Sequence, residues 1–329
     1  MTTLAPTLEA FFTERLLRQR HASPHTVAAY RDTFRLLLGY AQEHTGKAPS
    51  ALSIEDLDAP FIGGFLEHLE QQRHNGVRTR NARLAAIHSL FRYAALRHPD
   101  HVDAIARVLA IPSKRHERAL VSFLSEPELA ALLAAPNVET WLGRRDHALL
   151  LVAAQCGLRV SELTRLLCDD VHLGQGPYVR CHGKGRKERV TPFSPITVNT
   201  LRRWLSERGG QPQDPLFPTR RGLPLSSDAV AKLVAKYAGT AALACPSLLR
   251  KRVTPHTLRH TAAMRLLQAG VDTTVIALWL GHEQIETTAI YLHADLTIKE
   301  RALERTTPPG SVPGRYHPPD PLLTFLESL

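Results

Sequence analysis

The sequence predicts a mainly α-helical protein with a small β-sheet, an α+β fold divided into two domains. Three observations lead to this fold class. The chain has 329 residues, enough to bury two hydrophobic cores. Apolar residues recur at helical spacing through the first hundred residues. One stretch of the second half, residues 178–193, has instead the pattern of a β-hairpin, and helical spacing returns after it.

The first hundred residues carry helix start signals as well as helical spacing. Ser23 can cap a helix, and Pro24 suits the first helical position. Helices are predicted over 8–20, from Ser23 through Leu38, over 53–56, from Ala59 through Leu69, and over 79–97.

The last of these helices lies in a stretch of unusual charge. No acidic residue occurs between Glu70 and Asp100, whereas six arginines do. The apolar residues of the helix form one stripe, so the arginines can occupy the remaining face. A solvated surface helix has the same pattern, but the lack of compensating acids favours contacts with DNA phosphates. The predicted DNA-binding residues are Arg73, Arg78, Arg80, Arg83, Arg92, Arg97, Lys114 and Arg115.

A domain boundary is expected where the hydrophobic periodicity fades and prolines and basic residues accumulate, after His98. The expected division is a helical DNA-binding domain at 1–105, a basic linker at 106–122, a second domain at 123–303 and a proline-rich tail at 304–329. The apolar end of this tail, Leu322–Leu329, is expected to dock on its own protomer or on a neighbouring one.

The second domain begins with a predicted capping box, in which Ser125 and Glu128 satisfy each other's backbone N–H groups. A helix from Arg144 ends at Gly157, a residue that suits the left-handed conformation after a helix. The hairpin follows, and its turn region carries glycines and cations. Further helices are predicted over 197–208, 226–237 and 274–280 and from Pro255 onward.

Composition narrows the functional classes. The four cysteines lie far apart without a C-x-x-C pair, which indicates reduced thiols and no disulfide framework or zinc ribbon. No apolar run approaches the roughly 20 residues that span a bilayer, and no basic stretch precedes an apolar segment at the N-terminus. A cytoplasmic protein without a membrane partner is therefore expected. A net charge of +10 indicates a polyanionic partner.

Six residues of the second domain have the chemistry that phosphodiester cleavage requires. Tyr291 can supply a nucleophile if cations favour its phenolate. The guanidinium forks of Arg159 and Arg259 suit two phosphate oxygens. Lys184, on the hairpin, can donate a proton to a leaving oxygen. His256 and His282 complete the set, because His256 shares a helix face with Arg259 and a turn after Gly281 exposes His282.

One alternative is a metal site. His256 and His260 are four residues apart on a helix, as in half of a zinc site. Thr257 stands where a zinc protease carries its glutamate, which argues against a metallohydrolase. No metal is therefore expected, and His260 is interpreted as a buried helix residue.

Four segments resemble the motifs of the tyrosine recombinase, or phage integrase, family. They are Gly157–Leu163, His256–His260, Leu280–His282 and Thr287–Tyr291. The resemblance spans nearly the whole chain, and the interval of nine residues from His282 to Tyr291 matches the family pattern. It implies a core-binding domain and a catalytic domain that close as a C-shaped clamp on duplex DNA.

The resemblance also implies a role for each residue. Arg159 and Arg259 would hold the scissile phosphate, and Glu162 would support Arg159. His256 and His282 would hydrogen-bond the phosphate and assist proton transfer, and Lys184 would be the general acid. Tyr291 would form a 3′-phosphotyrosyl bond and release a 5′ hydroxyl.

The expected function is site-specific DNA recombination without ATP, metal or another cofactor, in integration, excision, resolution or transposition. The expected assembly is a homo-tetramer on two DNA sites, with itself or with a related recombinase. Two alternatives stay open at this stage. One is a type IB topoisomerase-like enzyme that acts on one duplex, and the other is a non-catalytic DNA-binding protein.

Overall fold

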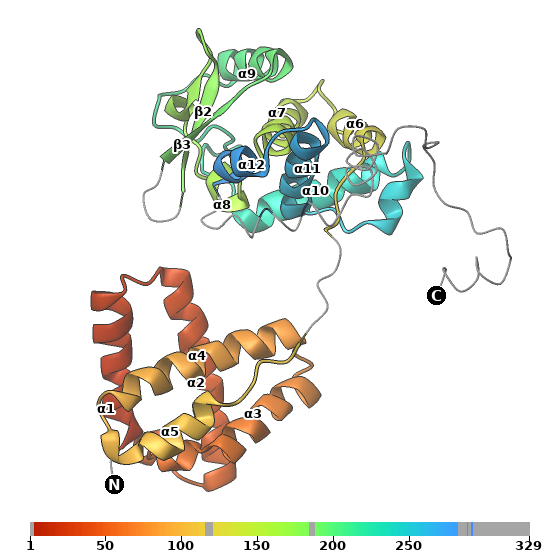
Figure 1. Ribbon diagram of the computed structural model, residues 1–329. Helices are drawn as coiled ribbons and strands as arrows, with labels where there is room; N and C mark the ends of the chain where they lie inside the picture. Colours follow the sequence, from red (N-terminus) through yellow and green to blue (C-terminus); the bar gives the residue numbers. More distant parts are fainter. Residues whose placement is uncertain (1–2, 116–120, 184–187, 282–287, 289–290, 292–329) are drawn as a thin grey trace, which may run out of the picture. The chain divides into compact units, whose positions relative to one another are not determined.

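The computed structural model describes residues 3–115, 121–183, 188–281, 288 and 291. The chain divides into two compact units, unit 1 (Met1–Arg118) and unit 2 (Ala119–Leu329). Helices dominate both units, and the one sheet found in the described residues has three strands (Figure 1). The predicted fold class is therefore confirmed. No helix in the described part of the chain is long and apolar enough to cross a membrane.

Unit 1 is a bundle of helices around one apolar core. Its elements are α1 (Leu4–Ala10), the wider helical segment η1 (Phe11–Gln19), α2 (Pro24–Thr45), the short 3₁₀ turns η2 (Pro49–Ala51), η3 (Glu55–Leu57) and η4 (Pro99–His101), α3 (Ala59–Gln71), α4 (Val77–Ala95) and α5 (Val102–Leu109). The Ser23 hydroxyl accepts the backbone N–H of Thr26 at 3.2 Å, so the predicted cap of α2 is confirmed. The core is rich in aromatic rings, which include Phe11, Phe34 and Phe65.

Helix α5 corrects the predicted start of the linker. Ile105 and Val108 are buried in the core of unit 1, so the helix belongs to that unit although the linker was expected from residue 106. The chain stays attached further still, because the Asn81 side chain donates to the Lys114 carbonyl at 2.8 Å and accepts the Lys114 N–H at 3.1 Å. The segment after α5, which contains Pro112 and Lys114, therefore lies along the surface of unit 1.

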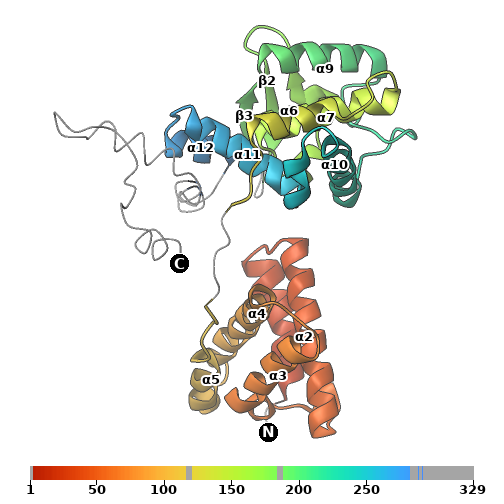
Figure 2. The ribbon, with the colours of Figure 1, turned by 90° about the vertical axis from the view of Figure 1, so that its right-hand side faces the viewer.

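Unit 2 combines the sheet with a larger set of helices (Figure 2). Its elements are α6 (Glu126–Ala134), α7 (Trp141–Cys156), α8 (Val160–Leu163), η5 (Cys168–Asp170), β1 (Val171–His172), β2 (Tyr178–His182), β3 (Glu188–Pro192), α9 (Pro195–Arg208), α10 (Ser227–Ala241), η7 (Pro246–Arg250), α11 (Pro255–Gln268) and α12 (Thr273–Leu280). Helix α7 is largely buried and packs against α6, α9 and α11. The predicted capping box is present, with the Ser125 N–H donating to Glu128 at 2.8 Å.

The sheet has the strand order β1-β2-β3 and is antiparallel throughout. The predicted hairpin is β2 and β3, in which Cys181 lies opposite Arg189. Strand β1 was not predicted, because its two residues are too few to show an alternating pattern. Helix α9 lies beside the sheet (Figures 1 and 2), and the C-terminal end of α12 reaches β3.

Candidate active site

Two helices of unit 2 end next to each other, and both end in a left-handed glycine. Gly157 follows α7 with φ +62°, and Gly281 follows α12 with φ +65°. A Cβ atom on Gly157 would lie 2.6 Å from the Leu280 side chain, so only glycine allows the two helix ends to approach this closely. The last carbonyl groups of a helix have no partner within it and carry partial negative charge. Two such ends together form a place that favours cations.

The two predicted phosphate-binding arginines occupy this place. Arg259, on α11, donates from Nη1 to the Gly157 carbonyl at 2.6 Å and from Nη2 to the Leu280 carbonyl at 2.8 Å. Arg159, which precedes α8, donates from Nη2 to the Gly281 carbonyl at 2.8 Å. The two guanidinium groups therefore bind consecutive carbonyls at the end of α12. This shared binding place brings Arg159 and Arg259 together, although they lie a hundred positions apart in the sequence. The Arg159 side chain is 40% exposed, whereas Arg259 is 3% exposed.

Glu162 links Arg159 to a third arginine. Its Oε1 accepts from Arg159 Nη1 at 2.9 Å and from Arg189 Nη1 at 3.0 Å, and its Oε2 accepts from Arg189 Nη2 at 2.8 Å. Burial by itself would raise the pKa of Glu162, but the hydrogen bonds and charges of Arg189 and Arg159 lower this pKa to about 2. The expected contact between Glu162 and Arg159 is present, whereas the role of Arg189 was not predicted.

The described part of this cluster carries surplus positive charge. Arg159, Arg189 and Arg259 face one carboxylate, Glu162, which gives three positive charges against one negative charge. Burial, and then repulsion from Arg159, lower the pKa of Arg259 to about 10. Concentrated and partly desolvated positive charge is stabilised by an anion. The cluster is therefore suited to bind an anionic group such as a phosphate.

His256 lies in the first turn of α11, beside this charge. The Thr254 hydroxyl accepts the Thr257 N–H at 3.2 Å and Pro255 is the first helical residue, so the predicted start of the helix is confirmed. The pKa of His256 is lowered for two reasons. The surrounding protein removes part of its hydration, and Arg259 and Arg159 repel a positive charge on the imidazole. The imidazole is therefore neutral near pH 7 and can both donate and accept hydrogen bonds.

Tyr291 lies in an apolar cluster near Arg259. It is 1% exposed and packs with a group of residues from α11 and α12 that includes Met264 and Ile276. Its hydroxyl lies 3.0 Å from Nδ1 of His260, whose ring is 4.1 Å from that of His256. Burial raises the pKa of Tyr291, and the charge of Arg259 partly opposes this rise.

His260 was interpreted from the sequence as a buried helix residue without a role in the chemistry. It is half-buried and contacts the predicted nucleophile directly. The spacing of four residues from His256 was the available signal, because it places the two rings on one helix face. Four of the six predicted catalytic residues, Arg159, His256, Arg259 and Tyr291, thus lie together. Lys184 and His282 lie outside the described residues, as does the Leu322–Leu329 segment.

The predicted DNA-binding residues of unit 1 lie in different environments. Arg73, Arg78, Arg92, Arg97, Lys114 and Arg115 are exposed, and Arg83 is half-buried. Two of the exposed residues have acidic partners: Arg97 pairs with Glu14, and Lys114 pairs with Glu70 at 2.6 Å.

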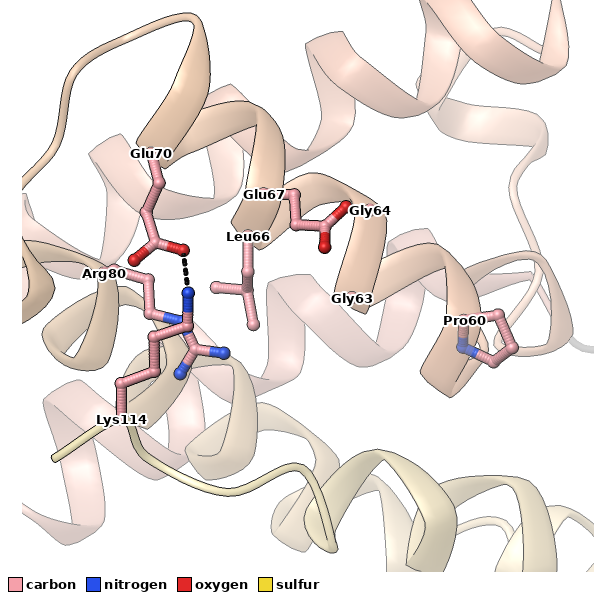
Figure 3. Close-up of a pocket in the computed structure, with 8 residues that line it drawn as sticks. All are labelled: Pro60, Gly63, Gly64, Leu66, Glu67, Glu70, Arg80 and Lys114. Atoms are coloured by element: carbon pink, nitrogen blue, oxygen red, sulfur yellow. Dashed lines mark hydrogen bonds and ion pairs between the residues drawn. The ribbon is translucent and has the colours of Figure 1, made fainter.

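Arg80 does not fit the predicted role. It is 7% exposed and donates from Nη1 to the Pro112 carbonyl at 3.1 Å. Its side chain lies with Lys114 and Glu70 at a pocket of about 440 Å³ beside α3 (Figure 3). Arg80 therefore holds the chain after α5 against α4, because its position on α4 faces the inside of unit 1.

Comparisons with known proteins match both units. Residues 122–297 match the phage integrase family, and residues 10–98 match the phage integrase N-terminal SAM-like domain. A Sinorhizobium fredii protein named "Putative integrase/recombinase y4rC" is 56% identical over 327 residues, which cover 99% of this chain and 98% of that protein. The tyrosine recombinase XerD of Pseudomonas putida is 34% identical over 289 residues, with 86% and 91% covered. Among solved structures, the Tn1549 transposon integrase in complex with transposon right end DNA has a similar fold, with a TM-score of 0.69 at 15% identity and coverage of 92% and 99%.

Proposed function

Because the chain belongs to the phage integrase family and is a tyrosine-type site-specific DNA recombinase, we propose that Tyr291 cuts DNA by forming a 3′-phosphotyrosyl bond. The family and the relatives support recombination, and they do not support the type IB topoisomerase-like or the non-catalytic alternative. The proposal concerns the residues that perform the reaction and the assembly in which they act.

One observation carries the assignment of the site: Arg159 and Arg259 bind consecutive carbonyls at the end of α12. Each guanidinium has more N–H groups than these contacts use, so each can also donate to a phosphate oxygen. Attack on a phosphodiester adds negative charge to its non-bridging oxygens. The surplus positive charge of the cluster stabilises that added charge most strongly in the transition state, which is the condition for lowering the barrier.

The proposed reaction exchanges one phosphate ester for another. The oxygen of Tyr291 forms a bond to the phosphorus, and the bond from phosphorus to the 5′ oxygen breaks. The phenol releases its proton to water, and the 5′ oxygen gains a proton, for which we propose Lys184 as the donor. We propose that His256 and His282 hydrogen-bond the phosphate. A 5′ hydroxyl of a second strand reverses the steps, and because the phosphotyrosyl ester replaces the cleaved ester, rejoining needs no ATP.

We further propose how the protein engages DNA. The exposed arginines of unit 1, which include Arg78 and Arg92, would contact phosphates of the DNA duplex. Four protomers of this protein, or of this protein and a related recombinase, would act on two DNA sites. Removal of the residues from Pro318 onward tests whether the Leu322–Leu329 segment joins protomers. If it does, the mass of the complex with DNA and the strand exchange both fall.

The nucleophile is tested with a DNA substrate that is nicked near the cleavage point, so that the short product leaves and the covalent complex accumulates. The wild type is expected to form a complex that survives denaturing electrophoresis. Tyr291→Phe is expected to form none while it binds the same DNA. Tyr178→Phe is the matched control, because Tyr178 lies in unit 2 on β2 and should leave the complex unchanged. A covalent complex that persists in Tyr291→Phe would overturn the assignment.

A further inference from the structure

Arg189 has no place in the proposed chemistry, yet it is built into the active site. It lies on β3, and its side chain is 12% exposed. Nη1 and Nη2 bind the two oxygens of Glu162 at 3.0 and 2.8 Å, and Nε binds the Trp279 carbonyl at 3.0 Å. We infer that Arg189 is a positioning residue that sets the orientation of Arg159 through Glu162. This inference rests on the proposed function, because it assumes that Arg159 holds the scissile phosphate.

The first argument is the way in which the carboxylate is shared. Each oxygen of Glu162 accepts one bond from Arg189 and one from Arg159, which uses its backbone N–H at 2.8 Å for Oε2 and its Nη1 at 2.9 Å for Oε1. Two parallel bonds from a planar fork fix the plane of a carboxylate, whereas a single bond leaves it free to rotate. Arg189 therefore determines where the Oε1 that binds Arg159 lies.

The second argument concerns the other anchor of Arg159, the Gly281 carbonyl. Arg189 also packs against this residue, since a Cβ atom on Gly281 would lie 2.9 Å from Arg189 Nη1 and 3.2 Å from its Cδ. The bond from Arg189 to Trp279 holds the same helix end two residues earlier. Both protein groups that Arg159 binds through its guanidinium are thus held in place by Arg189.

The third argument separates positioning from direct contact. All three nitrogens of the Arg189 guanidinium donate to protein groups, and its side chain is 12% exposed against 40% for Arg159. Arg159 is therefore the member of the pair that can reach a DNA phosphate. Lysine cannot replace Arg189, because one ammonium on a flexible stem cannot bind two carboxylate oxygens and a carbonyl in a fixed geometry.

The inference is tested by a double-mutant cycle on the full-length protein. Single-turnover formation of the covalent complex on nicked DNA is measured for the wild type, Arg189→Lys, Arg159→Lys and the variant with both changes. Arg189→Lys is expected to slow the reaction about tenfold or more while its Kd for DNA changes less than about twofold, because transition-state contacts are lost and binding contacts are not. Since Arg189 acts through Arg159, the variant with both changes should be no slower than Arg159→Lys.

A loss in the variant with both changes that equals the product of the two single losses would show that Arg189 acts independently, and would overturn the inference. An Arg189→Lys rate equal to that of the wild type would overturn it as well. Wild-type protein that forms no covalent complex would instead refute the proposed function. The matched control is Arg144→Lys, because Arg144 makes the same fork with Glu207, at 2.6 Å for both bonds, on the surface of unit 2.

A second variant addresses folding. Glu162→Gln keeps the shape of the side chain and removes the charge that Arg189 and Arg159 share. It is expected to slow the covalent step by about as much as Arg189→Lys, with little further loss when the two changes are combined. If Arg189→Lys does not fold, this variant is compared with Arg159→Lys in the same cycle. Independent losses there would equally overturn the inference.

Discussion

Burial moves the pKa values of Tyr291 and His256 in opposite directions, because in both residues it favours the uncharged form. Near neutral pH the site therefore combines a neutral phenol, a neutral imidazole and permanently charged arginines. In the proposed reaction the arginines of the described cluster supply positive charge to the phosphate, and the phenol of Tyr291 must lose its proton during or before attack.

The rate of covalent complex formation is therefore expected to rise with pH. The raised pKa of Tyr291 keeps the phenolate fraction small throughout pH 6.5 to 9, so the rate should increase by up to about tenfold per pH unit where proton loss limits it. Single-turnover reactions at constant ionic strength measure this directly. A rate independent of pH across this interval would show that phenol ionisation does not control the step.

At the same scale, the sequence identified the residues with recognisable chemistry, and the family resemblance identified Glu162 as a support for Arg159, but Arg189 was missed. Arg159 and Arg259 stand out because their chemistry matches a phosphate. Arg189 does not, because its neighbours on β3 show only a short strand pattern, and its contacts with Glu162 and Trp279 arise from folding. Arg80 was misassigned for a related reason: the four arginines on α4 do not all face outward, and the sequence does not show where α5 packs.

At the scale of elements, the site depends on the way in which α12 ends. Gly281 must adopt φ +65° and must also leave room for Arg189. Gly281→Ala is expected to cost about 1–2 kcal/mol of folding free energy for the left-handed backbone, and to slow the covalent step because the new methyl group displaces Arg189. Denaturant unfolding followed by tryptophan fluorescence measures the first effect, and adduct formation measures the second.

The matched control is Gly270→Ala. Gly270 has φ +83° in the same unit, but nothing lies within 4 Å of its Cβ position. This variant should lose comparable stability and keep its rate. If both variants were equally slow, the effect of Gly281→Ala would come from backbone strain and not from Arg189.

Elements with strong local signals were predicted well, which include the capped starts of α2, α6 and α11 and the end of α7 at Gly157. Local hydrogen bonds decide these features, so the local sequence contains them. Strand β1 was not predicted, and the predicted linker boundary at residue 106 divided helix α5. A two-residue strand and an eight-residue helix form mainly through contacts with elements elsewhere in the fold.

At the scale of the whole molecule, the two units have separate cores, and unit 2 contains two carboxyls whose pKa is strongly lowered. Burial alone would raise the pKa of Glu128, but hydrogen bonds from Lys251, Ser125 and Ser247 lower it to about 2, the same value as for Glu162. A carboxyl with a lowered folded pKa stabilises the fold above its unfolded pKa, and this stabilisation is lost as the pH falls. Each of these two carboxyls contributes about 3 kcal/mol at neutral pH.

The protonation of these two carboxyls is therefore expected to lower the stability of unit 2 as the pH falls below 4.5 toward 2. Since all three tryptophans lie in unit 2, their fluorescence reports this unit alone. Glu128→Gln should lower stability at pH 7 by about 3 kcal/mol and reduce the dependence on pH. Glu207→Gln, at an exposed ion pair with Arg144, should change little, and equal effects of both variants would contradict this account.

The net charge of +10 predicts that DNA affinity falls steeply with salt. Arg78 and Arg92 are exposed on α4, and the described residues give neither an ion pair. Changing either to alanine should weaken binding on all DNA sequences and lower the slope of log K against log salt by about one. Arg80→Ala should instead destabilise unit 1 with little direct effect on the slope. DNA titrations at several salt concentrations measure the slope, and hydrogen exchange of the unit 1 amides measures the stability.

The burial of Tyr291 has a consequence for how often the protein can cut DNA. If Tyr291 attacks a phosphate as proposed, its ring is expected to leave the cluster of Met264 and Ile276 and its hydroxyl to leave His260. Re-exposing an aromatic ring to water costs about 4 kcal/mol, which leaves about one molecule in a thousand with an available nucleophile. We therefore expect the protein to leave most DNA sites that it meets by charge alone uncut. Contacts at the correct recombination site would have to supply the free energy that shifts this population.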